Sequence, residues 1–217
     1  MTQANDSIAV TPGTGATVAT HLVNGKEYQV VMVADVDGHI QGSPDAYRLL
    51  VPASAVGANK VHLDLFNATG SGKLMHIQSA YCYPDIDTAV TGTLGVEVAL
   101  TRTSAVGTGG TAATFEGTSI TAATISRMDT ASPTLPAQVT ARSAPTGGAT
   151  AGAWLASRFV FTEETSAPAG IAAAIGAEFI RHVGSDLTVR EGEGVRFLQG
   201  AVASVGTLTF EITFHLV

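Results

Sequence analysis

The sequence is poor in the residues that build disulfide frameworks and charged binding surfaces. Its 217 residues include one cysteine, Cys82, which excludes internal disulfide bonds and zinc clusters held by several thiolates. Charged residues make up only 13 %, and 18 acidic side chains outnumber 11 basic ones, for a net charge of −7. Binding to nucleic acid depends on basic side chains that neutralise phosphates. We therefore expect no nucleic-acid partner.

Long apolar runs are also lacking. No stretch approaches the roughly 18 uninterrupted apolar residues that a membrane-spanning helix requires. Residues 1–6 carry no basic region followed by an apolar run, which is the pattern of a secretory signal. We therefore expect neither a membrane protein nor an exported one.

Small and hydroxyl-bearing residues take the place of charge. The chain holds 34 Ala, 28 Thr and 24 Gly, and 45 % of its residues are hydrophobic. A chain this apolar can offset the entropy cost of ordering by burying a core. The composition predicts a folded protein whose surface polarity comes from hydroxyl groups and backbone.

Alternation of apolar and polar residues is the strongest structural signal. At positions 208–216 every second residue is Leu, Phe or Ile, and the residues between are Thr, Glu or His. This period predicts a half-buried β-strand, and residues 61–65 and 94–100 show it as well. Further strands are expected at residues 26–34, 74–83, 154–162, 186–190 and 195–199. The glycines at 192 and 194 predict a tight hairpin between the last two.

Helix signals are few. Residues 43–50 could form a single turn after Pro44, and the Ala-rich segment 169–180 is interrupted by Gly170 and Gly176. Many short strands with Gly-rich connections predict an all-β fold, namely an antiparallel β-sandwich of jelly-roll type. A closed barrel is the structural alternative.

The first fifty residues differ in pattern from the rest. A lead-in of Thr, Gly and Ala is followed by an apolar run, residues 28–34, between an Asn-Gly and an Asp-Gly turn. We interpret residues 1–50 as an N-terminal arm or hairpin for attachment and residues 51–217 as the sandwich domain. Two small-residue loops, 104–114 and 143–153, are expected to be exposed and mobile, or ordered only by a partner.

Motifs for nucleotide or calcium binding are incomplete. Residues 68–74 (ATGSGKL) suggest a phosphate loop, but that motif needs Gly at Asn67 and Ser or Thr at Leu74. Residues 35–38 (DVDG) begin like a calcium loop without its remaining ligands. Turns are the favoured interpretation of both, and no cofactor is implied.

Catalytic patterns are equally sparse. His62 with Asp64, and Glu211 with His215, could each share a strand face and contribute to a metal or acid–base site, but solvated sheet positions are the favoured interpretation. Local carboxylate pairs occur at 35/37, 85/87, 163/164 and 191/193, without the aromatic platform of a sugar hydrolase. No nucleophile elbow or His-Glu-x-x-His pattern occurs. We expect a protein that is not an enzyme.

The N-terminal segment carries a family resemblance. Residues 6–20 read DSIAVTPGTGATVAT, residues 23–31 read VNGKEYQVV, and an Asp-Gly turn follows at Asp37. This opening resembles that of tailed-bacteriophage virion proteins in which a Pro-Gly-x-Gly-Ala-Thr-Val stretch leads into a Gly-centred turn, a valine-ended strand and an Asp-Gly turn. Residues 187–195 with the final strand are similar to the closing hairpin of viral jelly rolls.

The resemblance implies a structural role in a virion and no catalytic residues. The first hypothesis is a capsid decoration (cement) protein, a homo-oligomer with a trimer favoured, bound to the major capsid protein or another virion component. The alternative is a neck, tail or baseplate fibre component. For attachment we expect strand pairing by residues 26–34 with another chain, and the interface residues Tyr28, Val30, Met32, Val33 and His39.

A carbohydrate-binding module is the third hypothesis. Sandwiches often present a face or loops to glycans, and stacking on a sugar would need converging aromatic side chains. Aromatic residues amount to only 6 %, and the candidates are Tyr47, Tyr81, Tyr83 and Trp154. Nothing in the sequence brings these four together.

Overall fold

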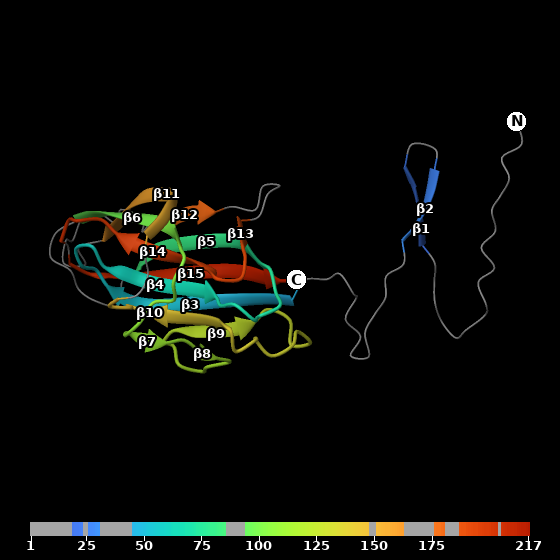
Figure 1. The fold of residues 1–217 in the computed structure, drawn as a ribbon. Coiled ribbons are helices and arrows are strands. Elements are labelled where there is room, and N and C mark those ends of the chain that lie inside the picture. Colours follow the sequence, from blue (N-terminus) through green and yellow to red (C-terminus); the bar gives the residue numbers. More distant parts are fainter. Residues whose placement is uncertain are drawn as a thin grey trace, which may run out of the picture. The chain divides into compact units, whose positions relative to one another are not determined.

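The structure, a computed structural model, describes residues 19–23, 26–30, 45–85, 94–147, 151–162, 176–180, 187–203 and 205–217. The chain divides into two compact units, residues Met1–Ser43 and Pro44–Val217. In the first unit, the described residues form an antiparallel hairpin of β1 (Ala19–Val23) and β2 (Lys26–Val30), seen in Figure 1. No described segment forms a helix long and apolar enough to cross a membrane.

The second unit is a sandwich of two sheets, which confirms the all-β prediction (Figure 1). Neighbouring strands pair antiparallel except β8 with β9. The β4 sheet has the order β11 (Ala151–Thr162), β6 (Leu94–Thr103), β14 (Glu193–Gln199), β4 (Val61–Asn67), β10 (Val139–Ser143), β7 (Thr111–Ala112). The β15 sheet has the order β12 (Ala177–Ile180), β5 (Met75–Asp85), β15 (Thr207–Leu216), β3 (Asp45–Ala55), β9 (Thr124–Arg127), β8 (Thr114–Phe115), and β13 (Leu187–Val189) also pairs with β5.

The inner faces of the two sheets form one core. The alternation predicted for β15 is confirmed, since all five of its apolar residues are buried: Leu208, Phe210, Ile212, Phe214 and Leu216. Three aromatic rings meet at the centre, where the ring centroid of Phe197 lies 4.9 Å from those of Phe179 and Phe210. Contacts between sheets therefore fix which face of each strand is inside.

The sandwich begins earlier than the predicted boundary at residue 50. Strand β3 starts at Asp45 and pairs with β15 along its length, so the helical turn predicted for residues 43–50 is wrong. Its residues Tyr47, Leu49 and Val51 are buried at every second position. This strand period outweighs the local helix-start signal of Pro44.

Two other expectations are also corrected. The end of the Ala-rich segment, β12, is a strand rather than a helix, and residues 169–175 lie outside the described residues. The turn at Glu191 and Gly192 does not close a hairpin, because β13 belongs to the β15 sheet and β14 to the β4 sheet. The chain crosses between the sheets at this turn.

The two small-residue loops are ordered against each other where they are described. The amide of Thr108 donates to the carbonyl of Gly147 at 2.7 Å, and the amide of Thr146 donates to the carbonyl of Thr108 at 2.9 Å. Pro145 is buried in this contact. The described parts of the two loops therefore contact each other and cover the outer face of β4.

Candidate functional site

The predicted attachment residues lie in the N-terminal unit. Tyr28 and Val30 belong to β2, whereas Met32, Val33 and His39 lie outside the described residues. Strand β2 pairs with β1 in a regular register from Ala19 opposite Val30 to Val23 opposite Lys26. One edge of β2 is thus already used, and pairing with another chain would have to use its other edge.

The register of the hairpin separates its residues into two faces. Because alternate residues of paired strands share a face, Tyr28 and Val30 fall on the same face as their partners His21 and Ala19. The opposite face holds the pairs Thr20 with Gln29 and Leu22 with Glu27. A two-stranded hairpin is marginally stable by itself in water. Its more apolar face is therefore the candidate for contact with a partner.

His62 is buried rather than solvated, contrary to the sequence interpretation. Its Nδ1 lies 2.8 Å from the hydroxyl of Ser54, and its Nε2 lies 3.1 Å from Oε1 of Gln199. Because an amide oxygen only accepts, Nε2 carries the proton, and Nδ1 accepts from the Ser54 hydroxyl. The ring stacks on Phe210 with centroids 4.7 Å apart. Burial, with a smaller contribution from the Lys60 charge, lowers the pKa of His62 to about 4.

A β-bulge explains why this polar position points inward. In the pairing of β4 with β14, Phe197 lies opposite Leu63 and Leu198 lies opposite Val61, so His62 is the extra residue. A bulge places an additional residue on one strand and re-aims its side chain. In a regular strand, His62 would face solvent because Leu63 faces the core. The bulge instead places both side chains on the buried side.

The Ser54–His62–Gln199 cluster ties three strands together. A serine hydroxyl bonded to a histidine is the arrangement of a nucleophile and its base. Here, however, Ser54 is only 8 % exposed and His62 is fully buried, so a substrate would have to open the fold to reach them. Gln199 also accepts from the amide of Gly57 and donates to the carbonyl of Val202. We assign the cluster a structural role.

Asp64 is likewise buried on the outer face of β4. Its Oδ2 accepts from the amide of Gly107 at 2.7 Å, and Arg142 and Arg196 lie opposite it on the two neighbouring strands. Burial raises the pKa of Asp64, against the opposing effects of the Gly107 amide and the two arginines. The loop that carries Gly107 covers this carboxylate, a long-range contact that β4 alone does not reveal.

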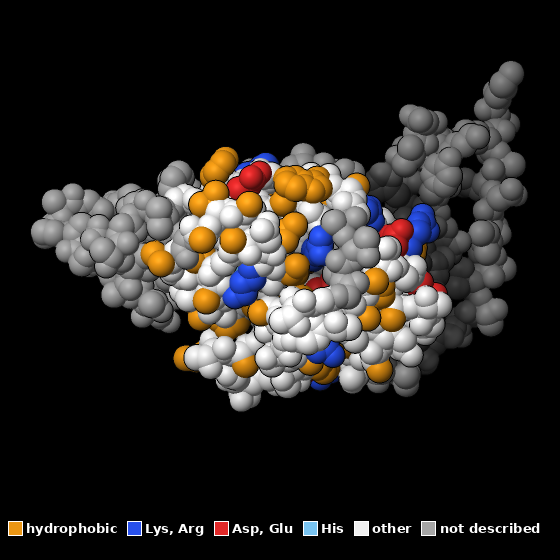
Figure 2. Space-filling model, turned by 60° about the vertical axis from the view of Figure 1, so that its left-hand side comes forward, with side chains coloured by type: hydrophobic (Ala, Val, Ile, Leu, Met, Phe, Trp, Pro, Cys, Tyr) orange, Lys and Arg blue, Asp and Glu red, His pale blue; other side chains and the backbone are white. Residues whose placement is uncertain are grey.

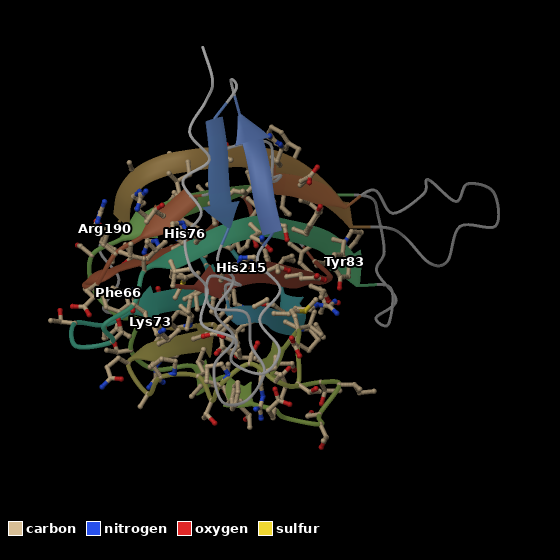
Figure 3. All side chains as sticks on the ribbon, turned by 90° about the vertical axis from the view of Figure 1, so that its right-hand side faces the viewer. Phe66, Lys73, His76, Tyr83, Arg190 and His215 are labelled. Carbon is tan, nitrogen blue, oxygen red and sulfur yellow. The ribbon has the colours of Figure 1, made fainter. Side chains whose placement is uncertain are left out.

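Glu211 and His215 do share the outer face of β15. Glu211 is engaged with the guanidinium of Arg48 at 2.6 Å. His215 lies directly opposite His76 of β5, and Figure 3 shows both labelled side chains on these adjacent strands. Among the described residues, no group of three or more His, Cys, Asp or Glu side chains is placed to hold a metal ion.

The loop that resembles a phosphate loop holds an internal carboxylate. Gly70 and Gly72 have positive φ angles of 90° and 66°, and the amide of Gly72 donates to Oε1 of Glu191 at 2.5 Å. The hydroxyl of Ser71 donates to the same oxygen at 3.3 Å. These donors lower the pKa of Glu191. Amides turned into such a nest bind anions, and here the anion is the protein's own side chain. Lys73 and Arg190 lie at this end of the sandwich, opposite Tyr83 (Figure 3).

The other carboxylate pairs do not form a described site. Glu193 accepts from Arg102 and from the amide of Arg190, which is a structural contact at the end of β14. Residues 35, 37, 87, 163 and 164 lie outside the described residues, as does the side chain of Asp85. The predicted pairs therefore supply no described acid–base couple.

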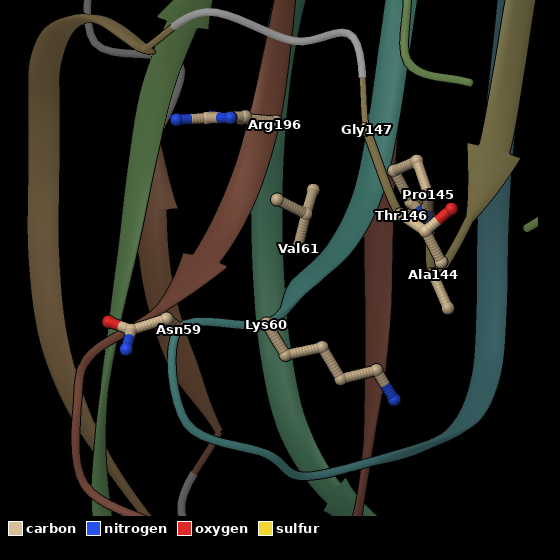
Figure 4. A pocket seen from close by; sticks show the side chains of 8 residues that line it. All are labelled: Asn59, Lys60, Val61, Ala144, Pro145, Thr146, Gly147 and Arg196. Atoms are coloured by element: carbon tan, nitrogen blue, oxygen red, sulfur yellow. The ribbon is translucent and has the colours of Figure 1, made fainter. Parts of the chain in front are cut away.

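A cavity of about 480 Å³ lies beside the loop that covers Asp64, and Figure 4 shows its lining. The lining residues are Asn59, Lys60, Val61, Ala144, Pro145, Thr146, Gly147 and Arg196. Arg196 and Lys60 point in different directions (Figure 4), and Lys60 donates to the carbonyl of Ala55. The cationic groups therefore do not converge on one ligand position.

The four candidate aromatic residues for sugar stacking lie apart. Tyr47 is completely buried. Tyr81 and Tyr83 belong to β5 of the β15 sheet, whereas Trp154 belongs to β11 of the β4 sheet and is 61 % exposed. On the face shown in Figure 2, hydrophobic side chains are scattered and charged ones are few. No shared stacking platform results from these residues.

Comparisons with protein-family models, with curated proteins and with solved structures found no match for this chain.

Proposed function

We propose that the chain is a structural protein of a tailed-bacteriophage virion, and within that class a capsid decoration protein. The observation that carries the proposal is the division of the chain into two units. The first holds the segment that resembles phage virion proteins, and the second is a β-sandwich whose buried polar groups serve its own packing. This is the organisation expected of a subunit that attaches by an arm and stabilises a shell.

The strand order of the sandwich supports a jelly-roll interpretation. In an eight-stranded jelly roll, the last strand lies between the first and third, and the seventh lies between the second and fourth. Here β15 lies between β3 and β5, and β14 lies between β4 and β6. Strands β11 and β12 flank β6 and β5 as fifth and sixth strands would. The short strands β7 to β10 are then an insertion beside β3 and β4.

The arm provides the contact with the shell in this proposal. The hairpin face that carries Tyr28 and Val30 gains stability by packing against the major capsid protein or another virion component. The edge of β2 that faces away from β1 can add backbone hydrogen bonds to a sheet of the partner. The proposed location is therefore the assembled virion, with copies of the chain grouped as a homo-oligomer, a trimer in the decoration hypothesis.

Attachment can be measured by cosedimentation of the purified chain with shells that lack it. Tyr28→Asp and Val30→Asp should each reduce binding at least about tenfold, because a charge is placed where apolar contact is required. Gln29→Asp, on the opposite face of the same strand, is the matched control and should bind like the unaltered chain.

Equal binding by all three variants would overturn the role of this hairpin face. If the unaltered chain fails to bind any shell but sediments with tails, the neck or tail alternative replaces decoration. Binding to neither particle contradicts the virion proposal as a whole.

A further inference from the structure

Two histidines lie directly opposite each other on the outer face of the β15 sheet. His215 of β15 pairs with His76 of β5, and Figure 3 shows both labelled side chains. The sequence places His215 on the same strand face as Glu211, but the carboxylate of Glu211 is bonded to Arg48. The imidazole next to His215 therefore comes from another strand, which no local pattern reveals.

The backbone bonds at the end of these strands set the separation of the two histidines. Leu74 and Val217 exchange both of their N–H···O bonds, at 3.0 and 3.1 Å. Pairs with and without such mutual bonds alternate along an antiparallel ladder, so the next pair lacks them and His215 with His76 is again a bonded pair. The Cα atoms of such a pair lie about 5.5 Å apart. Two imidazoles that start from this separation on one face can both reach a single ion.

Thr188 of β13 contacts one of the two rings. It lies opposite His76 on the other side of β5, and its Oγ1 is 3.2 Å from Nδ1 of His76. A hydroxyl can accept the Nδ1 proton, and in that tautomer the lone pair of His76 is on Nε2. Histidines that bind metals commonly donate their second ring N–H to an oxygen acceptor. This contact therefore prepares Nε2 of His76 as a ligand.

The surroundings of the pair admit a hydrated cation. Both histidines and Thr188 are half-buried, so solvent reaches this part of the face. Arg48 is a cation on the same face, but its guanidinium is held by Glu211 at 2.6 Å. The net charge of −7 also favours a cation over an anion as the ligand of this chain.

We infer that His76 and His215 form a binding site for one divalent transition-metal ion, with Zn²⁺ as the ion that fits best. Imidazole nitrogen is a preferred ligand of Zn²⁺, at about 2.0–2.1 Å. The described residues contain no group of three or more His, Cys, Asp or Glu that could hold a metal, so water takes the other coordination positions. The ion binds reversibly and joins β15 to β5 near the end of the two strands.

Calorimetric titration of the full chain with Zn²⁺ tests this site. His76→Gln and His215→Gln should each weaken binding at least about tenfold, because one nitrogen cannot chelate the ion. His21→Gln, in strand β1 of the other compact unit, is the matched control and should bind Zn²⁺ like the unaltered chain. Acidification to about pH 5 should release the ion, since a ligating imidazole must be unprotonated.

The role of Thr188 is tested separately, as that of a positioning residue. Thr188→Val removes the oxygen that holds the His76 ring and should weaken Zn²⁺ binding about tenfold, whereas Thr188→Ser should restore it. Failure of Thr188→Ser to bind better than Thr188→Val would overturn this role.

Thermal unfolding provides an independent readout. Zn²⁺ should raise the melting temperature of the unaltered chain and of His21→Gln, because only the folded sheet holds the two nitrogens together. It should not raise that of His76→Gln. Absence of Zn²⁺ binding by the unaltered chain, or equal affinity in His76→Gln and His21→Gln, would overturn the inference. Neither result bears on attachment to a shell, which the hairpin variants test.

Discussion

At the scale of single residues, the sandwich buries polar side chains and hydrogen-bonds most of their atoms, although Oδ1 of Asp64 has no hydrogen-bond partner among the described residues. His62 bridges Ser54 and Gln199, and Asp64 receives the amide of Gly107. Removing one partner of a buried polar pair costs more than the pair contributes, because the remaining group loses its hydration. These side chains therefore constrain the sequence of the strands that carry them.

The buried histidine predicts a loss of stability in acid. The pKa of His62 is about 4 in the folded chain, against about 6.5 when unfolded. Between these values the unfolded state binds the extra proton, so stability falls as the pH drops below about 6.5 and levels off below about 4. Relative to His62→Gln, the free energy of unfolding of the unaltered chain should fall by about 3 kcal/mol from pH 7 to pH 4.

Urea unfolding at several pH values measures this difference. All other ionisable groups are present in both chains, so their contributions cancel in the comparison. A difference that stays constant across this window would mean that the imidazole is not buried in its neutral form.

A glycine in β14 predicts a second residue-level effect. A Cβ added at Gly194 would lie 2.6 Å from the carbonyl oxygen of Leu65 and 2.8 Å from a methyl of Thr103. Shifting the backbone of β4 to relieve this clash would cost free energy. Gly194→Ala should therefore destabilise the fold by about 1–3 kcal/mol. At Gly57 the nearest atoms are 3.5 Å away on the Lys60 side chain, and Gly57→Ala should melt like the unaltered chain. Equal melting of the two variants would contradict the close approach of β14 to β4 and β6.

At the scale of elements, the two-residue period predicts where strands lie, but it does not predict the bulges that interrupt them. The alternation of β15 could be predicted from its sequence because one face meets the core and the other does not. The inward turn of His62 could not, since it depends on a bulge set by pairing with β14. Strand order and the crossing at Glu191 also depend on contacts far apart in the chain, which a local pattern does not contain.

The buried face of β15 predicts which substitutions the strand tolerates. Phe210 is completely buried against Phe197 and His62, so Phe210→Asp should abolish the cooperative thermal transition. Thr213 lies on the opposite face, directly across from Arg48. Thr213→Asp should therefore leave the melting temperature within a few degrees of that of the unaltered chain. A cooperative melt of Phe210→Asp at the unaltered temperature would show that the face assignment is wrong.

At the scale of the whole molecule, the sandwich and the N-terminal segment form two separate compact units. Their division after Ser43 lies near the boundary read from sequence, and the difference arises because β3 extends back to Asp45. For the candidate attachment site, the sequence could indicate a segment of the chain but not its contacts. Tyr28 and Val30 are located in a strand, but a local pattern does not identify the chain that they contact.

The sandwich should stay folded when most of the N-terminal unit is removed. Every strand of the sandwich begins at or after Asp45, so deleting residues 1–40 should leave the circular dichroism spectrum and the thermal transition of the sandwich intact. The same deletion should remove attachment to shells. Loss of the folded spectrum would make the N-terminal unit part of the core and would contradict the proposed division of roles.

The most direct test of the central claim is the copy number of the chain in purified virions, measured by quantitative mass spectrometry against the major capsid protein. Decoration of the shell predicts a ratio that approaches one copy per capsid subunit. A few copies per particle would indicate a neck, tail or fibre component instead. Absence of the chain from the virion would contradict the proposed function.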